Sequence, residues 1–367
     1  MIIHKPLTVV LAGATLALAT LLGLGSAGAV GSSPKFNEPW GIATSGGDAF
    51  ITNGLGHSVT EINSTTGAVV RVISGASYDF DGLSSIVVSG GNVFVTDAGG
   101  PGRLTEFSAA TGKLVRVLTA SQLEGYGVGI TLGSLAVNGP DLFIVGDTSV
   151  GSTTANPLVC GVLELNVASG KLIRVIKGAS YNFQDCTTIS FGGGDGFVVN
   201  TGPVGTTGPG WVTEFNATTG KFVRVIKGAS YKFELSTIIG AKGSEAFVAG
   251  PTYLSEISTA TGKLVRVLSA KSYGFSEPEA ISFDGPDTFV ANLEPLPSNA
   301  PSGSITEFNT ATGKLVRVFT GASYHFDGPG DIVVRGDDAF VTNSFNSTVT
   351  EFSVTSGKVV RIFANAS

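Results

Sequence analysis

Short hydrophobic runs separated by turn-forming residues extend over most of this 367-residue chain. Each run is short and rich in β-branched and aromatic residues, and Gly, Asn, Asp, Ser or Pro ends it. Runs of this kind, bounded by turn residues, are typical of β-strands, and apolar positions on both strand faces fit sheets that pack on each other face to face. In the last repeat this pattern predicts four strands, at 331–335, 339–343, 348–353 and 358–363. No window after residue 30 holds a long apolar stripe of helical period, so we expect an all-β protein.

The group of four predicted strands recurs along the chain. Its clearest marker is a glycine that lies six residues after a glutamate and four residues before an arginine. The glycines recur every 42 to 58 residues and are Gly67, Gly112, Gly170, Gly220, Gly262, Gly313 and Gly357. A second marker, an aromatic and β-branched run such as FVTN (340–343), gives the same count of seven.

Seven units of four strands predict a seven-bladed β-propeller. The interval matches that of a four-stranded blade, and radial packing of such blades leaves only short sheet edges. The predicted blades are about 39–75, 83–118, 132–177, 186–227, 236–268, 278–319 and 329–364. The first unit begins with its first strand and the last ends with its fourth. We therefore expect the last blade to pack on the first without strand exchange.

The segment around each glycine, such as FNATTGKFVRV (215–225), predicts a β-hairpin. A three-residue loop, 218–220, would place Gly220 in the left-handed conformation. Counting outward from this loop pairs Phe215 with Val223 and Glu214 with Arg224, a favourable cross-strand couple. We therefore interpret the seven repeated arginines as part of the scaffold rather than as anion ligands.

The pattern of residues 1–29 predicts a secretory signal peptide. A short polar start with His4 and Lys5 precedes an uncharged apolar run at 7–24, and Ala27-Gly28-Ala29 offers a cleavage site. The alternative is an uncleaved anchor, because a run of about 18 residues is near the lower limit for a membrane span. We expect a secreted protein, or one at an extracytoplasmic surface, with no membrane span after cleavage.

The charge pattern narrows the class of partner. The chain has 22 basic and 28 acidic residues, a formal net charge of −6, and no cluster of Lys and Arg. Nucleic acid is therefore not an expected partner. We expect a monomer.

Two units resemble known propeller repeats. The last unit, DDAFVTNSFNSTVTEFSVTSGKVVRIF (337–363), resembles the YVTN-type repeat of secreted and surface-layer proteins. The first, EPWGIATSGGDAFITNGLGHSVTEINSTTG (38–67), is similar to an NHL-type repeat. The resemblance covers about residues 31–367 and implies the fold. It implies no single function, because such propellers include adhesins, sensors, lyases and lactonases.

The candidate ligand site is the face that carries the loops between the second and third strands, here called the b–c loops. These loops vary most between units, and variable loops on a rigid scaffold often bind ligands. The alternative is a solvated rim of turn residues. The candidate ligand-binding residues on this face and at the channel mouth are Trp40, Asn53, His57, Asp97, Arg103, Asp147, Asn200, Trp211, Glu279, Asn292, Glu294, Asp331 and Asn343.

The Asn and Asp side chains at the ends of the second strands have two interpretations. They offer the oxygens that Ca²⁺ would require, or they cap their own turns. Cys160 and Cys186 are expected on this same face in neighbouring blades, either as a disulfide or as two free thiols.

The sequence singles out no catalytic residue and no required cofactor. Only His57 and His325 remain after signal cleavage, and they occupy unrelated positions in the unit. We expect a binding module whose ligand is an extracellular protein or glycan. The alternative function is a Ca²⁺-dependent lactonase or lyase with its site at the channel mouth.

Overall fold

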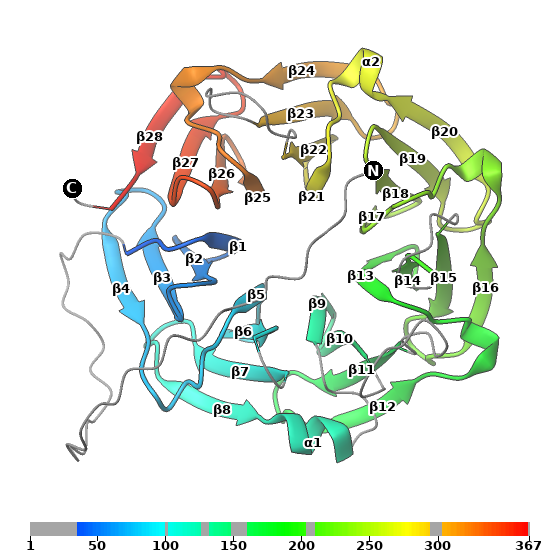
Figure 1. Ribbon diagram of the computed structural model, residues 1–367, viewed down its shortest axis with the longest axis horizontal. Helices are drawn as coiled ribbons and strands as arrows, with labels where there is room; N and C mark the ends of the chain where they lie inside the picture. Colours follow the sequence, from blue (N-terminus) through cyan, green and yellow to red (C-terminus); the bar gives the residue numbers. More distant parts are fainter. Residues whose placement is uncertain are drawn as a thin grey trace, which may run out of the picture.

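The protein forms a closed ring of seven four-stranded antiparallel sheets, as the sequence predicts (Figure 1). The computed structural model describes residues 35–99, 102–125, 132–147, 160–202, 210–293 and 303–365. The predicted signal peptide and Glu294 lie outside these ranges, as does the side chain of Asp147.

Each sheet is one blade, numbered 1 to 7 in chain order, and its strands follow one another from the channel to the rim (Figure 1). The innermost strands are β1 (Pro39–Ser45), β5 (Leu83–Ser89), β9 (Leu132–Asn138), β13 (Cys186–Gly192), β17 (Ile238–Lys242), β21 (Pro278–Asp284) and β25 (Pro329–Arg335). The second strands are β2 (Asp48–Asn53), β6 (Asn92–Asp97), β10 (Asp141–Asp147), β14 (Asp195–Asn200), β18 (Glu245–Gly250), β22 (Asp287–Asn292) and β26 (Asp338–Asn343).

The outer half of each blade is the predicted hairpin. Its inner strands are β3 (Ser58–Asn63), β7 (Arg103–Ser108), β11 (Cys160–Asn166), β15 (Trp211–Asn216), β19 (Tyr253–Ser258), β23 (Ser304–Asn309) and β27 (Thr348–Ser353). Its rim strands are β4 (Val69–Ile73), β8 (Leu114–Leu118), β12 (Leu172–Ile176), β16 (Phe222–Ile226), β20 (Leu264–Ser269), β24 (Leu315–Phe319) and β28 (Val359–Phe363). Short helices lie in the connectors between blades: α1 (Ala120–Gly125), η1 (Ala179–Tyr181), η2 (Ala229–Tyr231), α2 (Ala270–Tyr273) and η3 (Ala322–Tyr324).

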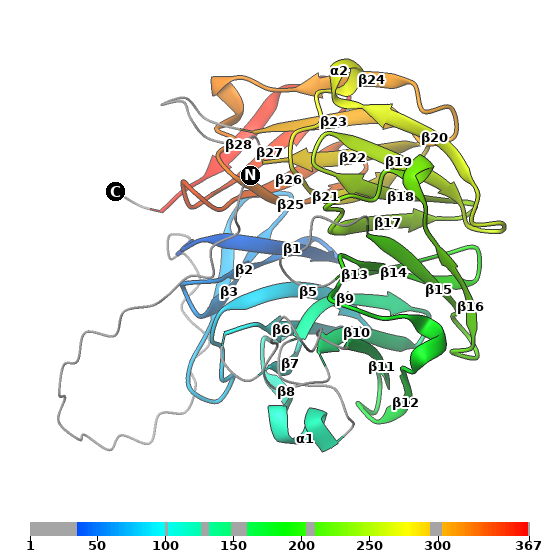
Figure 2. The ribbon, with the colours of Figure 1, turned by 45° about the vertical axis from the view of Figure 1, so that its right-hand side comes forward.

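Apolar clusters between neighbouring blades form the core. The cluster at the junction of blades 7 and 1, for example, joins Ile42 and Ile51 to Phe340, Val349 and Phe363. The oblique view shows the blades stacked side by side around the ring (Figure 2). Because both faces of each sheet pack on a neighbour, the middle strands are buried along almost their whole length.

The predicted Glu–Arg couple forms in all seven hairpins. Each glutamate pairs with its arginine in the strand register, and the nearest nitrogen–oxygen distances are 2.6 to 3.1 Å. The glutamates are buried and the arginines half-buried. Burial raises the pKa of Glu61, Glu214 and Glu351 to about 7, and the partner arginine opposes that shift.

The length predicted for the hairpin loop, three residues, is wrong. Asn216 pairs with Lys221 through a 2.8 Å backbone hydrogen bond, so the loop has four residues, 217–220. Phe215 then pairs with Phe222, and a β-bulge at Val223 restores the register between Glu214 and Arg224. The bulge turns the Val223 side chain outward, where it is 37 % exposed.

The arginines also join neighbouring blades. Arg71 of blade 1 donates to the carbonyl of Ala110 in the hairpin turn of blade 2, at 3.0 Å, and the other six arginines make the equivalent bond. The turn glycine makes room for this contact. A Cβ on Gly313, at φ 67°, would lie only 2.6 Å from Nη1 of Arg266. The positive φ therefore favours glycine in the turn, and a larger residue would also displace the arginine that crosses it.

The repeated GASYxF connector makes a second link between blades. The Tyr78 hydroxyl donates to the carbonyl of Gly112 at 2.6 Å, and Thr105 donates to the Tyr78 carbonyl at 3.0 Å. The same pair of bonds occurs at the connectors of Tyr181, Tyr231, Tyr273 and Tyr324.

Blade 7 closes on blade 1 through contacts of the same kind, without strand exchange. Arg361 donates to the carbonyl of Thr65 at 3.2 Å. Asn365 accepts the N–H of Phe36 and donates to its carbonyl, both at 2.7 Å, and thereby replaces the covalent connector found at the other junctions.

Arg266→Met should destabilise the protein more than Glu256→Gln. The arginine variant leaves the buried Glu256 carboxylate uncompensated and should cost about 2–4 kcal/mol of unfolding free energy, whereas the neutral amide should cost about 1 kcal/mol. Chemical denaturation at neutral pH measures both. The double variant should be more stable than Arg266→Met alone; a double variant at least as unstable would contradict this account of the couple.

Asn365→Ala should weaken the closure of the ring. Loss of two hydrogen bonds to the Phe36 backbone should lower the unfolding free energy by about 1–3 kcal/mol and make residues 35–45 exchange amide hydrogens faster. Asn138→Ala is the matched control, because the Asn138 side chain makes no hydrogen bond within the described residues. Equal stability of the two variants would show that Asn365 does not hold the junction.

Candidate functional site

The asparagines at the ends of the second strands hold the connectors to the blades. Asn200 accepts the N–H of Gln184 at 3.0 Å, and its amide donates to Thr213 at 3.1 Å. Asn53, Asn292 and Asn343 make the equivalent bonds and, like Asn200, are fully buried. Their amide oxygens are therefore engaged within the fold, by N–H groups of the connectors and not by their own turns.

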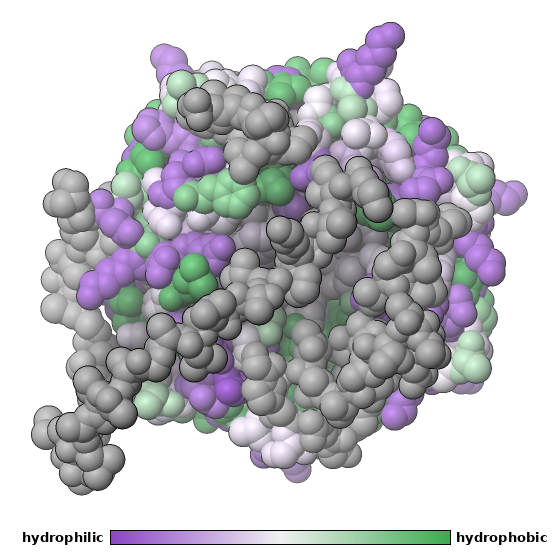
Figure 3. All heavy atoms as spheres, viewed as in Figure 1, coloured by the Kyte–Doolittle hydropathy of each residue, from purple (hydrophilic) through white to green (hydrophobic). Residues whose placement is uncertain are grey.

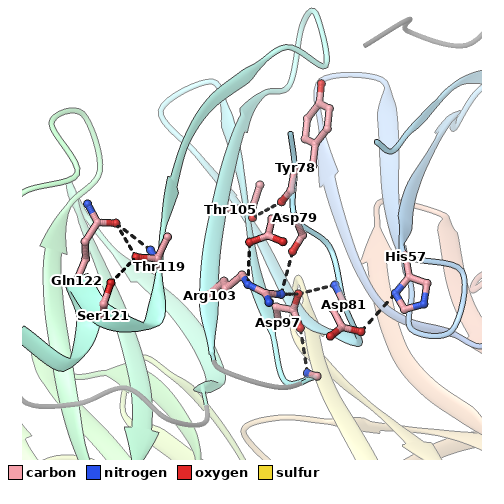
Figure 4. A network of polar contacts seen from close by, with 11 residues as sticks. His57, Tyr78, Asp79, Asp81, Asp97, Arg103, Thr105, Thr119, Ser121 and Gln122 are labelled. Atoms are coloured by element: carbon pink, nitrogen blue, oxygen red, sulfur yellow. Dashed lines mark hydrogen bonds and ion pairs between the residues drawn. The ribbon is translucent and has the colours of Figure 1, made fainter. Parts of the chain in front are cut away.

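Blade 2 replaces this amide by an ion pair (Figure 4). The buried Asp97 accepts the N–H groups of Asp81 and Gly99 and pairs with Arg103 at 3.2 Å. Arg103 also pairs with Asp79 at 2.9 Å, so both neighbouring carboxylates engage its charge. Burial raises the pKa of Asp97 to about 6, opposed by the backbone hydrogen bonds and by Arg103.

His57 and Trp211 lie at the rim of the same face. His57, in the b–c loop of blade 1, is half-exposed and approaches Asp81 at 3.8 Å. Trp211, at the start of β15 in blade 4, donates from Nε1 to the carbonyl of Asn182 at 2.9 Å, which ties this strand to the preceding connector.

Cys160 and Cys186 form a disulfide between blades 3 and 4. Cys160 begins β11 directly after the longest b–c loop, and Cys186 begins β13, the innermost strand of the next blade. Of the two interpretations of these cysteines, the structure has the disulfide, and it joins the start of β11 to the start of β13 in the neighbouring blade.

Two carboxylates lie at the starts of innermost strands near the channel mouth. Asp331 accepts the N–H groups of Ile42 at 2.9 Å and Ile332 at 2.8 Å, so it links blades 7 and 1. Glu279 makes no hydrogen bond or ion pair with any other described residue. Burial raises the pKa of Asp331 and of Glu279 to about 7, and the nearby Glu277 adds to the shift at Glu279.

An open pocket lies on this face between blades 1 and 2. It has a volume of about 260 Å³ and is lined by Glu38, Trp40, Gly54, Leu55, Gly82, Leu83 and Ser84. Trp40 is 39 % exposed and Leu55 is 55 % exposed. Phe345, in the b–c loop of blade 7, is 53 % exposed. Figure 3 shows small hydrophobic areas among hydrophilic residues over the side of the ring where β1–β3 and β26–β27 lie.

The structure therefore divides the predicted ligand-binding residues into those that line the pocket and those that make contacts within the scaffold. Trp40 lies in the pocket, whereas the second-strand asparagines, Asp97 and Arg103 act within the scaffold. The sequence analysis missed Glu38, Leu55 and Phe345. A signal for the last two was present, because each is the one large hydrophobic residue in a loop otherwise made of small or polar residues.

A metal site is not evident in the described part of the chain. It contains no group of three or more His, Cys, Asp or Glu side chains placed to hold an ion. None of the helices in the described ranges has the length and apolar character needed to span a bilayer.

Comparisons with known proteins support the fold alone. No family model matches the chain, and no curated protein matches it. Among 1092 similar chains of solved structures is the hydrazine synthase of Kuenenia stuttgartiensis, with a TM-score of 0.62, 14% identity and coverage of 88% of this chain and 97% of that one. The computationally designed Ika8 protein has a TM-score of 0.61, 12% identity and coverage of 90% and 88%. At such identities the likeness shows a shared propeller architecture and no shared activity.

Arg103→Ser should destabilise the protein by about 2–3 kcal/mol, because it leaves a buried carboxylate unpaired. Asp97→Asn together with Arg103→Ser copies the Asn53–Ser58 arrangement of blade 1 and should restore most of the loss. Chemical denaturation of both variants and the wild type tests this. A double variant no more stable than Arg103→Ser would contradict the assigned role.

Replacement of Asp97 should also change the pH dependence of stability. The folded pKa of Asp97, about 6, lies above its ordinary value of 3.8. Its favourable contribution is therefore complete below the ordinary value and is lost as the pH rises through the folded value. Asp97→Asn should flatten the corresponding fall in unfolding free energy between these two pH values.

Proposed function

We propose that this protein is a secreted or surface-exposed binding module that holds a protein or glycan ligand on its b–c loop face. The observation that supports this most is the pocket between blades 1 and 2, where Trp40 and Leu55 expose apolar surface beside variable loops. Export is supported by the pattern of residues 1–29, and a disulfide between blades is typical of oxidising compartments.

The alternative, a Ca²⁺-dependent lactonase or lyase, finds less support in the arrangement of oxygens. Such a site would need carboxylate and amide oxygens free to converge on an ion. The second-strand asparagines are engaged by connectors, and both oxygens of Asp331 accept backbone N–H groups. Glu279 would have to act with other groups.

The proposal predicts ligand binding that depends on the b–c loop face. The purified protein without residues 1–29 would be immobilised and exposed to a glycan array and to extracts of extracytoplasmic surfaces, either protease-treated or periodate-treated. Leu55→Asp combined with Phe345→Ser should reduce binding of the retained ligand by about tenfold or more, because both side chains belong to the exposed apolar surface.

Val265→Asp is the matched control. Val265 is 50 % exposed on the rim strand β20, away from the b–c loops, and the variant should bind like the wild type. The protease or periodate treatment that abolishes binding identifies the ligand class. Binding that survives the double change, or that the control change removes, would reject this face as the ligand site.

A further inference from the structure

The pocket between blades 1 and 2 has the size of a subsite for one side chain. Its volume of about 260 Å³ falls below the roughly 300–1,000 Å³ of typical pockets for drug-sized ligands. It is open to solvent on the b–c loop face, on the channel side of the ring, between the start of β1, the loop after β2 and the start of β5. A projecting side chain of a larger partner could therefore enter it.

The walls of the pocket are apolar. Of its lining residues Trp40 and Leu55 are exposed, whereas Leu83 is buried with 3 % of its surface exposed. Such walls favour an aliphatic stem, and an exposed indole favours a cation.

The polar group of the pocket is the Glu38 carboxylate. Its Oε2 lies 3.6 Å from the place that a Cβ on Gly54 would occupy, so the carboxylate reaches along the pocket wall that Gly54 leaves open. Glu38 makes no hydrogen bond or ion pair through its side chain with any other described residue. An ammonium or guanidinium group in the pocket would give this carboxylate a charged partner.

The fold does not require glutamate at this position. Glu38 has φ 54°, in the left-handed region. The corresponding position is glycine before β5 and β25 (Gly82 and Gly328, φ 79° and 68°) and a carboxylate before β13 and β21 (Asp185 and Glu277, φ 49° and 45°). Glycine adopts this conformation without strain. Because glycine serves at this position in blades 2 and 7, the backbone does not need the Glu38 carboxylate.

The charges around the pocket also favour a cation. Asp79, Asp81 and Asp97 lie in the adjoining connector and b–c loop of blade 2, and Figure 4 shows Arg103 held between Asp79 and Asp97. The nearby guanidinium is therefore already neutralised. His57 faces Asp81. The surroundings of the pocket are acidic, and an acidic ligand would be repelled.

We infer that this pocket takes a lysine or arginine side chain of a protein partner, with the stem on Trp40, Leu55 and Leu83 and the cationic head at Glu38. The inference rests on the proposed function and specifies its ligand as a protein. A glycan held by stacking on Trp40 is the outcome that would contradict it.

The test uses short peptides and the indole signals of the chain. The sequence contains two tryptophans, so ¹⁵N-labelled protein should show two indole Nε1–H resonances, and Trp211→Phe assigns that of Trp40. The probes are acetylated and amidated Gly-Gly-X-Gly-Gly peptides in which X is Lys, Arg, norleucine or Nε-acetyl-lysine. The Lys and Arg peptides should shift the Trp40 resonance saturably, and the two uncharged peptides should bind about tenfold more weakly.

Glu38→Gln should weaken binding of the Lys and Arg peptides about tenfold and leave the norleucine peptide unchanged. Glu245→Gln, at the start of β18 in blade 5, is the matched control and should change nothing. Raised salt should weaken only the charged peptides. A Trp40 signal unmoved by the Lys and Arg peptides, an equal response to norleucine, or no effect of Glu38→Gln would overturn the inference.

The two proposals can fail separately. A neutral oligosaccharide that shifts the Trp40 resonance while the basic peptides do not would overturn the cationic subsite and leave a glycan-binding module. Basic peptides that bind at Trp40, combined with full capture of the larger ligand by the Leu55→Asp, Phe345→Ser variant, would keep the subsite and reject the b–c loop face as the principal ligand site.

Discussion

The ring depends on a buried glutamate that holds an arginine between two blades. Glu256, for example, orients Arg266, and the guanidinium then reaches the carbonyl of Ala311 in the next blade. The glutamate could not be buried alone without a large desolvation cost, and the arginine would lose its fixed direction without it. One couple therefore stabilises the hairpin and aligns neighbouring sheets. The couple occurs in every blade. The arginine of the last blade therefore bonds the hairpin turn of the first blade, as each other arginine bonds the turn of the next blade.

This arrangement leaves the loop face free to vary. The connectors are held by scaffold contacts such as those of Asn200 and Tyr181, which involve no residue of a b–c loop. Loop residues can therefore change without loss of the ring. Blade 2 shows the same freedom in the scaffold itself, where Asp97 and Arg103 replace an amide and a hydroxyl. The pocket at Trp40 is built on this rigid base, as expected of a site that binds through a preformed surface.

The sequence predicted the blades and the Glu–Arg couples because both follow from local spacing. It did not predict the bulge at Val223, since a four-residue loop with a bulge and a three-residue loop give the same partner for Glu214. The sequence also did not predict two bonds between blades, from Arg71 to Ala110 and from Tyr78 to Gly112. They join segments more than thirty residues apart, so local spacing does not indicate them. Glu38 was missed because its importance lies in which residues surround it, and a single sequence does not show that.

The junction at Asn365 and Phe36 has a consequence for how the chain could be rearranged. Non-covalent contacts there perform the task that a peptide connector performs at the other junctions. The fold therefore does not depend on which junction lacks a peptide connector. A circularly permuted chain, opened at another connector and joined between Asn365 and Phe36, should form the same propeller.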